Sequence, residues 1–388
     1  MAEIPINPDV IRWARKTAGL TVDQVVEKIG RKGVTSDVVL AWEDGSQSPN
    51  YAQLERLAYE VYKRPLAIFF FPEPPEEASP RQSFRTLPDY EIELMPARIK
   101  LLLRKARALQ LNLSELYEGT NPSDKQIIRD LSFSPSDPAQ KIAAAVRTYL
   151  SVDLNSQFEI KDSDDAFKFW REKLEENGVF VFKDAFKEDS FSGFCLYDDR
   201  FPIIYVNNTK PFTRQIFTLF HELAHLLFKT GGIDIRLDDY IEYLVGDDKL
   251  IEILCNRFAG EFLVPTLDFQ KRIQGLPFDE STIQNLADTY HVSREVILRK
   301  LFDLNLVDQS YYQARVDAWA QEGSGDKGAG GNYYFNMGVY LGHTYIEKAF
   351  SRYHQNQIAV EQLADYLGVK VKSVPGMEAL LFQKGNIA

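Results

Sequence analysis

Cysteine is almost absent from this sequence, with Cys195 and Cys255 the only two among 388 residues. They have no framework spacing, which argues against a disulfide-stabilised secreted fold and favours a reducing compartment. Long apolar runs are also missing, since no window reaches the roughly 18 apolar residues of a membrane span. The first residues, MAEIPINPDVIRWARK, lack the charged and then apolar pattern of a signal peptide. We therefore expect a soluble, cytoplasmic protein with no membrane partner.

An excess of positive charge is lacking as well. The chain has 45 Lys and Arg against 56 Asp and Glu, a formal net charge of -11. This balance argues against a protein coated in basic surface for nucleic acid, although a local basic face is still allowed. The length is enough for more than one hydrophobic core, so we expect roughly two to four domains.

The order of patterns along the chain predicts a mostly helical α+β protein. Residues 1–72 are predicted to be an all-α domain, 73–95 a Pro-rich charged linker, 96–135 connecting helices, 136–310 a domain with a small β-sheet, and 311–388 a helical C-terminal domain after a Gly-rich loop. Three glycines of that loop, Gly323, Gly325 and Gly328, match G-x-G-x-x-G. No strand, helix or βαβ pattern surrounds them, so a dinucleotide site is not expected there.

The first connecting helix is predicted over residues 97–117, and its early part is basic. The basic residues are Arg98, Lys100, Arg104, Lys105 and Arg107. The favoured interpretation is a solvated face on a connecting helix, and contact with a DNA backbone is the alternative.

The stretch FTLFHELAHLLF, residues 217–228, sets two histidines and a glutamate in an otherwise apolar run. On a helix the polar residues fall within a strip about 100° wide: Thr218, His221, Glu222, His225 and Lys229. Apolar residues cover the remaining arc, so protein must surround this helix and the strip is expected to line a cavity. The helix should pack against the preceding β-rich segments. Two buried histidines with ordinary hydrogen bonds are the alternative to a metal site.

Residues four apart on a helix can direct two imidazoles at one Zn²⁺, which favours His221 and His225 as ligands. Glu222 is rotated out of the line of ligands, where it can take a proton from a metal-bound water and pass it to a leaving amine. A catalytic zinc needs a third protein ligand and leaves one position open for water. In IEILCNRFAGEFLVP, Glu252 is a candidate ligand, and Asn256 one turn later could fix a ligating histidine. Spacing alone leaves four other acids in competition: Glu242, Asp247, Asp248 and Glu261.

Together, FTLFHELAHLLF and EILCNRFAGEFLVP resemble the ImmA/IrrE family of metallopeptidases. The family pattern is a strand ending in Asn, then H-E-x-x-H, then E-x-x-A-N-x-F-A-x-x-L-L-M-P. Here the strand is IIYVNN, and Cys255 and Val264 replace the usual Ala and Met. The resemblance, over roughly residues 140 to 305, implies a zincin-like, gluzincin-type domain within 136–310. It also implies one Zn²⁺ per chain, with ligands His221, His225 and Glu252 and with Glu222 as the base.

Two further parts of a peptidase site are not selected by any spacing rule. The candidates for the oxyanion stabiliser are Tyr240, Tyr243, Tyr290 and His291, and ordinary packing or surface exposure explains each of them equally well. By analogy with other zinc peptidases, the strand PIIYVN is expected to be the sheet edge that pairs with an extended substrate.

The N-terminal segments IRWARKTAGLTVDQVVEKIG, VLAWEDGSQSPNYAQLERLA and FFFP resemble the Cro/repressor (XRE) helix-turn-helix domain. Helix two is expected at 21–29 and the recognition helix roughly at 35–43, although Val26 replaces a small Ala and the turn is longer than usual. The resemblance places Thr35, Ser36, Asp37 and Val39 on the DNA-reading face. Residues 1–65 carry nine basic and nine acidic residues, so phosphate attraction should be weak. Docking or dimerisation is the alternative role.

Taken together, the resemblances imply a transcriptional regulator with a zinc-dependent endopeptidase site. Its expected substrate is a protein partner such as a repressor, an antitoxin or a toxin, in a prophage or toxin–antitoxin setting, and DNA is a further partner through the N-terminal domain. The competing hypothesis is a DNA-binding regulator or antitoxin that uses the peptidase fold only to hold a partner.

Overall fold

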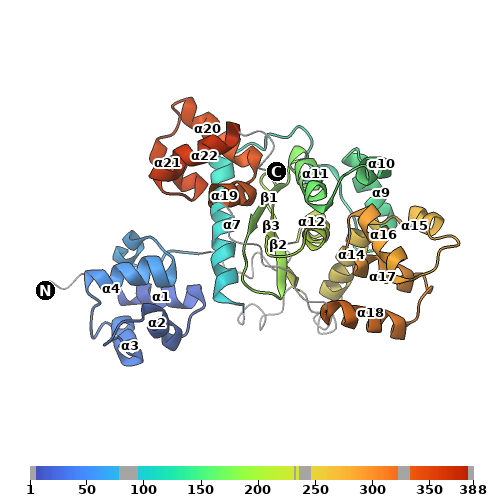
Figure 1. The fold of residues 1–388 in the computed structure, drawn as a ribbon. Coiled ribbons are helices and arrows are strands. Elements are labelled where there is room, and N and C mark those ends of the chain that lie inside the picture. The colour runs from blue at the N-terminus through green and yellow to red at the C-terminus, as the bar shows by residue number, and fades with distance from the viewer. Residues whose placement is uncertain (1–5, 78–94, 231–232, 236–245, 322–332, 383–388) are drawn as a thin grey trace. The chain divides into compact units, whose positions relative to one another are not determined.

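The structure, a computed structural model, describes residues 6–77, 95–230, 233–235, 246–321 and 333–382 (Figure 1). The chain forms two compact units, the first comprising Met1–Gln82 with Leu87–Lys105 and the second Ser83–Thr86 with Ala106–Ala388. Helix α7 (Ala97–Leu116) begins in the first unit and ends in the second. Among the described helices, none is both long and apolar enough to cross a membrane. The glycines Gly323, Gly325 and Gly328 lie outside the described residues.

The first unit is built from short helices around one apolar core. They are α1 (Pro8–Ala18), α2 (Val22–Ile29), α3 (Ser36–Asp44), α4 (Tyr51–Arg56), the π-helical turn η1 (Leu57–Tyr62) and the 3₁₀ turn η2 (Leu66–Phe70). Thr21 caps α2 in a capping box with Gln24, and Gly19, Gly30 and Gly45 end α1, α2 and α3 in the left-handed conformation. The second helix expected at 21–29 is confirmed, because the residues that cap and stop a helix act locally.

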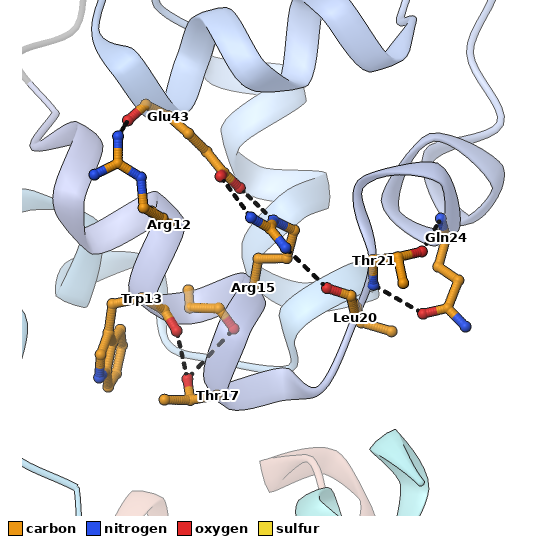
Figure 2. A network of polar contacts seen from close by, with 9 residues as sticks. Arg12, Trp13, Arg15, Thr17, Leu20, Thr21, Gln24 and Glu43 are labelled. Atoms are coloured by element: carbon orange, nitrogen blue, oxygen red, sulfur yellow. Dashed lines mark hydrogen bonds and ion pairs between the residues drawn. The ribbon is translucent and has the colours of Figure 1, made fainter. Parts of the chain in front are cut away.

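A buried ion pair joins α1 to α3 in this unit. The Arg15 guanidinium donates to both carboxylate oxygens of Glu43, at 2.6 and 2.8 Å, and to the backbone oxygen of Leu20 at 3.1 Å (Figure 2). Glu43 is 3% exposed, so removing either partner would leave a buried charge without its counter-ion. The pair therefore fixes how α3 is held against α1.

Helix α7 confirms the amphipathic helix expected over residues 97–117. At least one of its basic residues serves packing, because Arg104 donates to the backbone oxygen of Tyr62 at 3.3 Å and lies 3.9 Å from Glu77. Burial is the main reason that the pKa of Arg104 falls to about 10. A cation held in this way is less able to contact a DNA phosphate.

A four-stranded sheet with the order β1-β3-β2-β4 lies at the centre of the second unit. Its strands are β1 (Phe180–Asp184), β2 (Phe191–Leu196), β3 (Ile203–Asn207) and β4 (Ile233–Ile235). β3 pairs with β1 in parallel and with β2 antiparallel, and β2 also pairs with β4 antiparallel. β2 and β3 follow one another in the chain and form an antiparallel hairpin. The prediction that PIIYVN forms a sheet edge is wrong, because β3 has a strand on both sides.

Helices cover the sheet, and α12 is the one that bears the HELAH residues. Helix α12 (Phe212–Leu227) packs on β2 and β3, and α11 (Ser163–Glu176) packs on β1 and α12 (Figure 1). α14 (Gly246–Leu263) lies against α12 and against α9 (Ala139–Tyr149). The prediction that the HELAH helix is buried against a small sheet is therefore confirmed.

Short helices complete the second unit. Those around the sheet are α8 (Ile127–Asp130), α10 (Leu154–Phe158), α15 (Thr266–Arg272), α16 (Glu280–Tyr290), α17 (Arg294–Asp303) and α18 (Gln309–Gln321). The C-terminal helices are α19 (Tyr333–Leu341), α20 (His343–His354), α21 (Val360–Leu367), the 3₁₀ turn η3 (Val371–Ser373) and α22 (Val374–Phe382). α19 contacts β1, and Arg171 of α11 donates to the backbone oxygen of Val339 at 2.9 Å. The C-terminal helices thus pack onto the sheet domain.

Gly193 in β2 allows the strand to lie close to α12. A Cβ atom at this position would lie 2.5 Å from Cγ2 of Thr218 and 2.9 Å from the backbone oxygen of Tyr205. We expect Gly193→Ala to lower the free energy of unfolding by about 1–3 kcal/mol, because the core would be overpacked. Gly260→Ala is the matched control, since a Cβ there meets no atom within 4 Å. Urea unfolding should separate the variants, and equal midpoints would contradict the close approach.

Candidate metal centre

The three polar residues of the HELAH stretch lie on α12 where the helix is enclosed by protein. His221 is 2% exposed, and Glu222 and His225 are fully buried. Their Cβ atoms share one side of the helix because of their spacing, and the apolar residues between them pack into the main core of the second unit. This arrangement removes two imidazoles and a carboxylate from water. Their burial costs free energy unless each group has a hydrogen-bonding or charged partner.

Glu252 of α14 joins the two histidines. One of its carboxylate oxygens lies 3.5 Å from Nε2 of His221, and the other lies 3.3 Å from Nε2 of His225. Among the competing acids, Glu261 instead bonds Thr266 and Lys300, Glu242 lies outside the described residues, and the side chains of Asp247 and Asp248 are likewise not described. Within the described residues, His221, His225 and Glu252 are the one group of metal-ligating side chains that converge in this way.

The distances inside this cluster fit a small divalent cation. The two Nε2 atoms are 3.2 Å apart, Oε2 of Glu252 lies 3.5 Å from Nε2 of His221, and its other oxygen, Oε1, lies 3.3 Å from Nε2 of His225. Ligands about 2.0–2.2 Å from a tetrahedral zinc ion are about 3.3–3.5 Å from one another. The arrangement is that of three ligands facing a shared point, with Nε2 rather than Nδ1 of each histidine turned inward.

Asn256, one turn after Glu252, holds the first histidine. Its side-chain oxygen lies 3.0 Å from Nδ1 of His221. Because an amide oxygen only accepts hydrogen bonds, Nδ1 carries the hydrogen in this contact, and Nε2 is turned toward the cluster. The sequence predicted this contact from the four-residue spacing, and the structure brings the two residues together.

Burial and the two histidines shift the pKa of Glu252 in opposite directions. Burial raises the pKa of its carboxyl group, but the charges and hydrogen bonds of His225 and His221 together hold the pKa well below its usual range. Nearby, burial raises the pKa of the Cys255 thiol well above its ordinary value, and the carboxylates of Glu252 and Glu222 raise it further. The site therefore favours an ionised Glu252 and a protonated, uncharged Cys255.

Asn207, the last residue of β3, fixes the chain where it turns toward α12. The side chain is fully buried. Its amide nitrogen donates to the backbone oxygen of Phe191 at 2.7 Å, and its oxygen accepts from the backbone nitrogen of Phe186 and from Thr209. The Asn at the end of β3 therefore serves the structure, because its side chain holds the neighbouring backbone in place.

The candidates for the oxyanion stabiliser are not brought into the cluster by any described contact. The Tyr290 hydroxyl donates to Asp268 at 2.6 Å, and burial together with this bond raises the pKa of Tyr290. His291 ends α16 in the left-handed conformation, and burial lowers its pKa. Tyr240 and Tyr243 lie outside the described residues.

The predicted DNA-reading residues lie at the start of α3 in the first unit. Thr35 precedes the helix without a side-chain capping bond, and Asp37 is exposed. The placement of Val39 on the reading face is wrong, because its side chain is buried in the core of this unit. The Ser36 hydroxyl donates to Asp23 of α2 at 2.6 Å. Helix α3 contains no Lys or Arg, so a phosphate contact would have to come from another part of this unit.

The site and its helices define a peptidase-like domain. Residues 174–302, from the end of α11 into α17, match the family model of the IrrE N-terminal-like domain, peptidase family M78. The match supports the resemblance to ImmA/IrrE proteins for this part of the chain and a metallopeptidase-like function for it. It does not extend to the first unit, for which the Cro/repressor fold stays a prediction. No curated protein matches the chain.

The structure also identifies a contact that the sequence did not predict. Thr230, which follows α12, places its hydroxyl oxygen 3.2 Å from Nδ1 of His225. No motif in the sequence marks this residue, because the contact depends on how the chain turns after the helix.

Proposed function

We propose that the chain is a zinc-dependent endopeptidase that regulates transcription by cutting a protein partner. The observation that carries the proposal is the buried cluster of His221, His225 and Glu252, whose ligand atoms converge closely enough for one zinc ion and which lies inside the segment that matches a peptidase family. The two imidazoles and one carboxylate would be its protein ligands, at one ion per chain. Asn256 would keep His221 in the ligating tautomer.

Glu222 is the residue to which we assign proton transfer. It is fully buried beside His221 on the same helix, so its carboxylate is close to the ligands without sharing their direction. The carboxylate would accept a proton from the attacking water and deliver it to the nitrogen of the leaving amine. When bound, zinc would supply Lewis acidity that polarises the scissile carbonyl and brings the pKa of a water molecule to about 7.

The extended substrate would pair with β4. This strand is an end of the described sheet, with β2 on one side, and α12 packs close to it. A strand at the end of the described sheet, packed on the helix that carries two of the metal ligands, can hold a peptide backbone in the extended form that cleavage needs. The proposal moves the substrate edge from β3 to β4.

A direct test is incubation of the purified protein with the protein encoded beside it and with a mixed peptide library. We expect cleavage products by mass spectrometry, their loss after treatment with a chelator, and their return when about one equivalent of zinc per chain is added. Cleavage that survives complete removal of the metal would contradict the proposal. Protein that binds zinc but cuts neither substrate would favour the rival function.

The rival is a DNA-binding regulator or antitoxin that uses the peptidase fold as a non-catalytic partner-binding module. In both proposals α2 and α3 form a helix-turn-helix, with Thr35, Ser36 and Asp37 toward DNA. The two proposals differ in the role of Glu222. A module that only binds a partner does not need a buried carboxylate beside the metal ligands for any chemical step. Binding of a repressor or antitoxin without any cleavage would favour the rival.

A further inference from the structure

Helix α12 ends in a turn that reverses the chain directly after the second histidine. The backbone nitrogen of Lys229 donates to the oxygen of Leu226, and that of Thr230 donates to the oxygen of His225, both at 2.9 Å. Lys229 has φ +56°, in the left-handed region. These features define a Schellman motif, in which Lys229 takes the position usually filled by glycine. The reversal brings Thr230 back alongside the last turn of the helix, next to His225.

The hydroxyl of Thr230 makes two contacts with His225. It donates to the backbone oxygen of His225 at 3.0 Å, and its oxygen is 3.2 Å from Nδ1 of the imidazole. A hydroxyl has one hydrogen, and the backbone oxygen can only accept, so the hydrogen lies toward the backbone. The hydroxyl oxygen then accepts from Nδ1–H of His225, and Nε2 faces His221 and Glu252.

Thr230 thus does for the second histidine what Asn256 does for the first. In both cases an acceptor that lies outside the cluster bonds Nδ1 and leaves Nε2 turned toward the cluster. The backbone of Thr230 is also placed against the sheet, because the thiol of Cys195 in β2 lies 4.0 Å from its carbonyl oxygen. The acceptor for His225 is therefore held by the helix end and by β2.

We propose that Thr230 is a positioning residue, which uses the left-handed turn at Lys229 to hold His225 in the tautomer and orientation of a metal ligand. The inference rests on the proposed metal centre and adds to Asn256 a second residue that orients a ligating histidine. Loss of the hydroxyl should leave the fold in place, because a valine fills the same volume. The same change should remove the oxygen that accepts a hydrogen bond from Nδ1–H of His225.

The test compares Thr230→Val and Thr230→Ser with the wild-type chain. We expect zinc affinity, measured by competition with a coloured chelator, to fall about 10-fold in Thr230→Val and to stay near wild type in Thr230→Ser. The visible spectrum of the cobalt-loaded protein should shift only in the valine variant. Thr148→Val is the matched control, since Thr148 also donates to a backbone oxygen but is exposed on α9.

A second measurement does not depend on metal. Nitrogen NMR of metal-free protein with labelled histidine should show a hydrogen on Nδ1 of His225 that is hydrogen-bonded in the wild type, and a loss of that bond in Thr230→Val. Unchanged zinc affinity and an unchanged Nδ1 hydrogen bond in Thr230→Val would overturn the inference. If the wild type binds no zinc, the proposed function fails, while the NMR measurement still decides the role of Thr230.

Discussion

Glu222→Gln should lower the rate of peptide cleavage by roughly 10²–10⁴-fold and leave zinc affinity close to that of the wild type. The amide has nearly the same shape as the carboxylate, so the packing of α12 should persist. It cannot accept a proton from water at neutral pH, so the step that generates the nucleophile loses its base. Initial rates on a cleaved peptide, combined with zinc content per chain, measure the two effects separately.

Glu172→Gln provides the matched control for this variant, because it makes the same chemical change at an exposed position of α11. It should retain the wild-type rate and zinc content. Cleavage by Glu222→Gln at the wild-type rate would contradict the assigned role and leave Glu222 as a residue of the core. Loss of zinc together with activity would instead mean that Glu222 takes part in holding the metal.

Much of the site could be predicted from the sequence because two of its ligands lie close together on one helix. The four-residue spacing of His221 and His225 places them on one face of any helix, and the apolar residues between them require burial. The third ligand lies on another helix, and spacing alone left Glu252 among several acids. The family resemblance favoured it, and the packing of α14 on α12 brings it within 3.3 and 3.5 Å of the two Nε2 atoms.

Thr230 could not be predicted for a specific physical reason. A left-handed residue after a helix is expected where glycine stands, because glycine has no Cβ to oppose that conformation. Here Lys229 adopts it, and lysine gives no signal for the reversal that follows. The turn is instead maintained by the hydrogen bonds of Lys229 and Thr230 to the helix end.

Strand order was the part of the fold that local patterns could not determine. The strands β1, β2 and β3 are buried along their whole length, so they lack the alternation that distinguishes a covered face from an exposed one. Analogy with other zinc peptidases suggested that the last strand before α12 lies at an edge. The parallel pairing of β1 with β3 joins segments far apart in the chain and places β3 inside the sheet.

Glu252→Gln should remove most of the stabilisation that zinc gives to the wild-type protein. For a ligand that binds only the folded state, zinc at 100 times its dissociation constant adds about 2.7 kcal/mol to the free energy of unfolding. The variant keeps two imidazoles but loses the negative charge that faces both of them. Its affinity should therefore fall by more than the roughly 10–100-fold typical for loss of a residue that only orients a ligand.

Thermal unfolding with and without zinc measures this effect, and Glu172→Gln again serves as the control. We expect the zinc-dependent rise in the midpoint to be nearly absent in Glu252→Gln and complete in Glu172→Gln. An unchanged rise in Glu252→Gln would show that another acid supplies the third ligand. Asp247 and Asp248, at the start of the same helix, would then be the residues to replace next. Because His221 and His225 would keep their places in that case, the metal site would survive with a different third member.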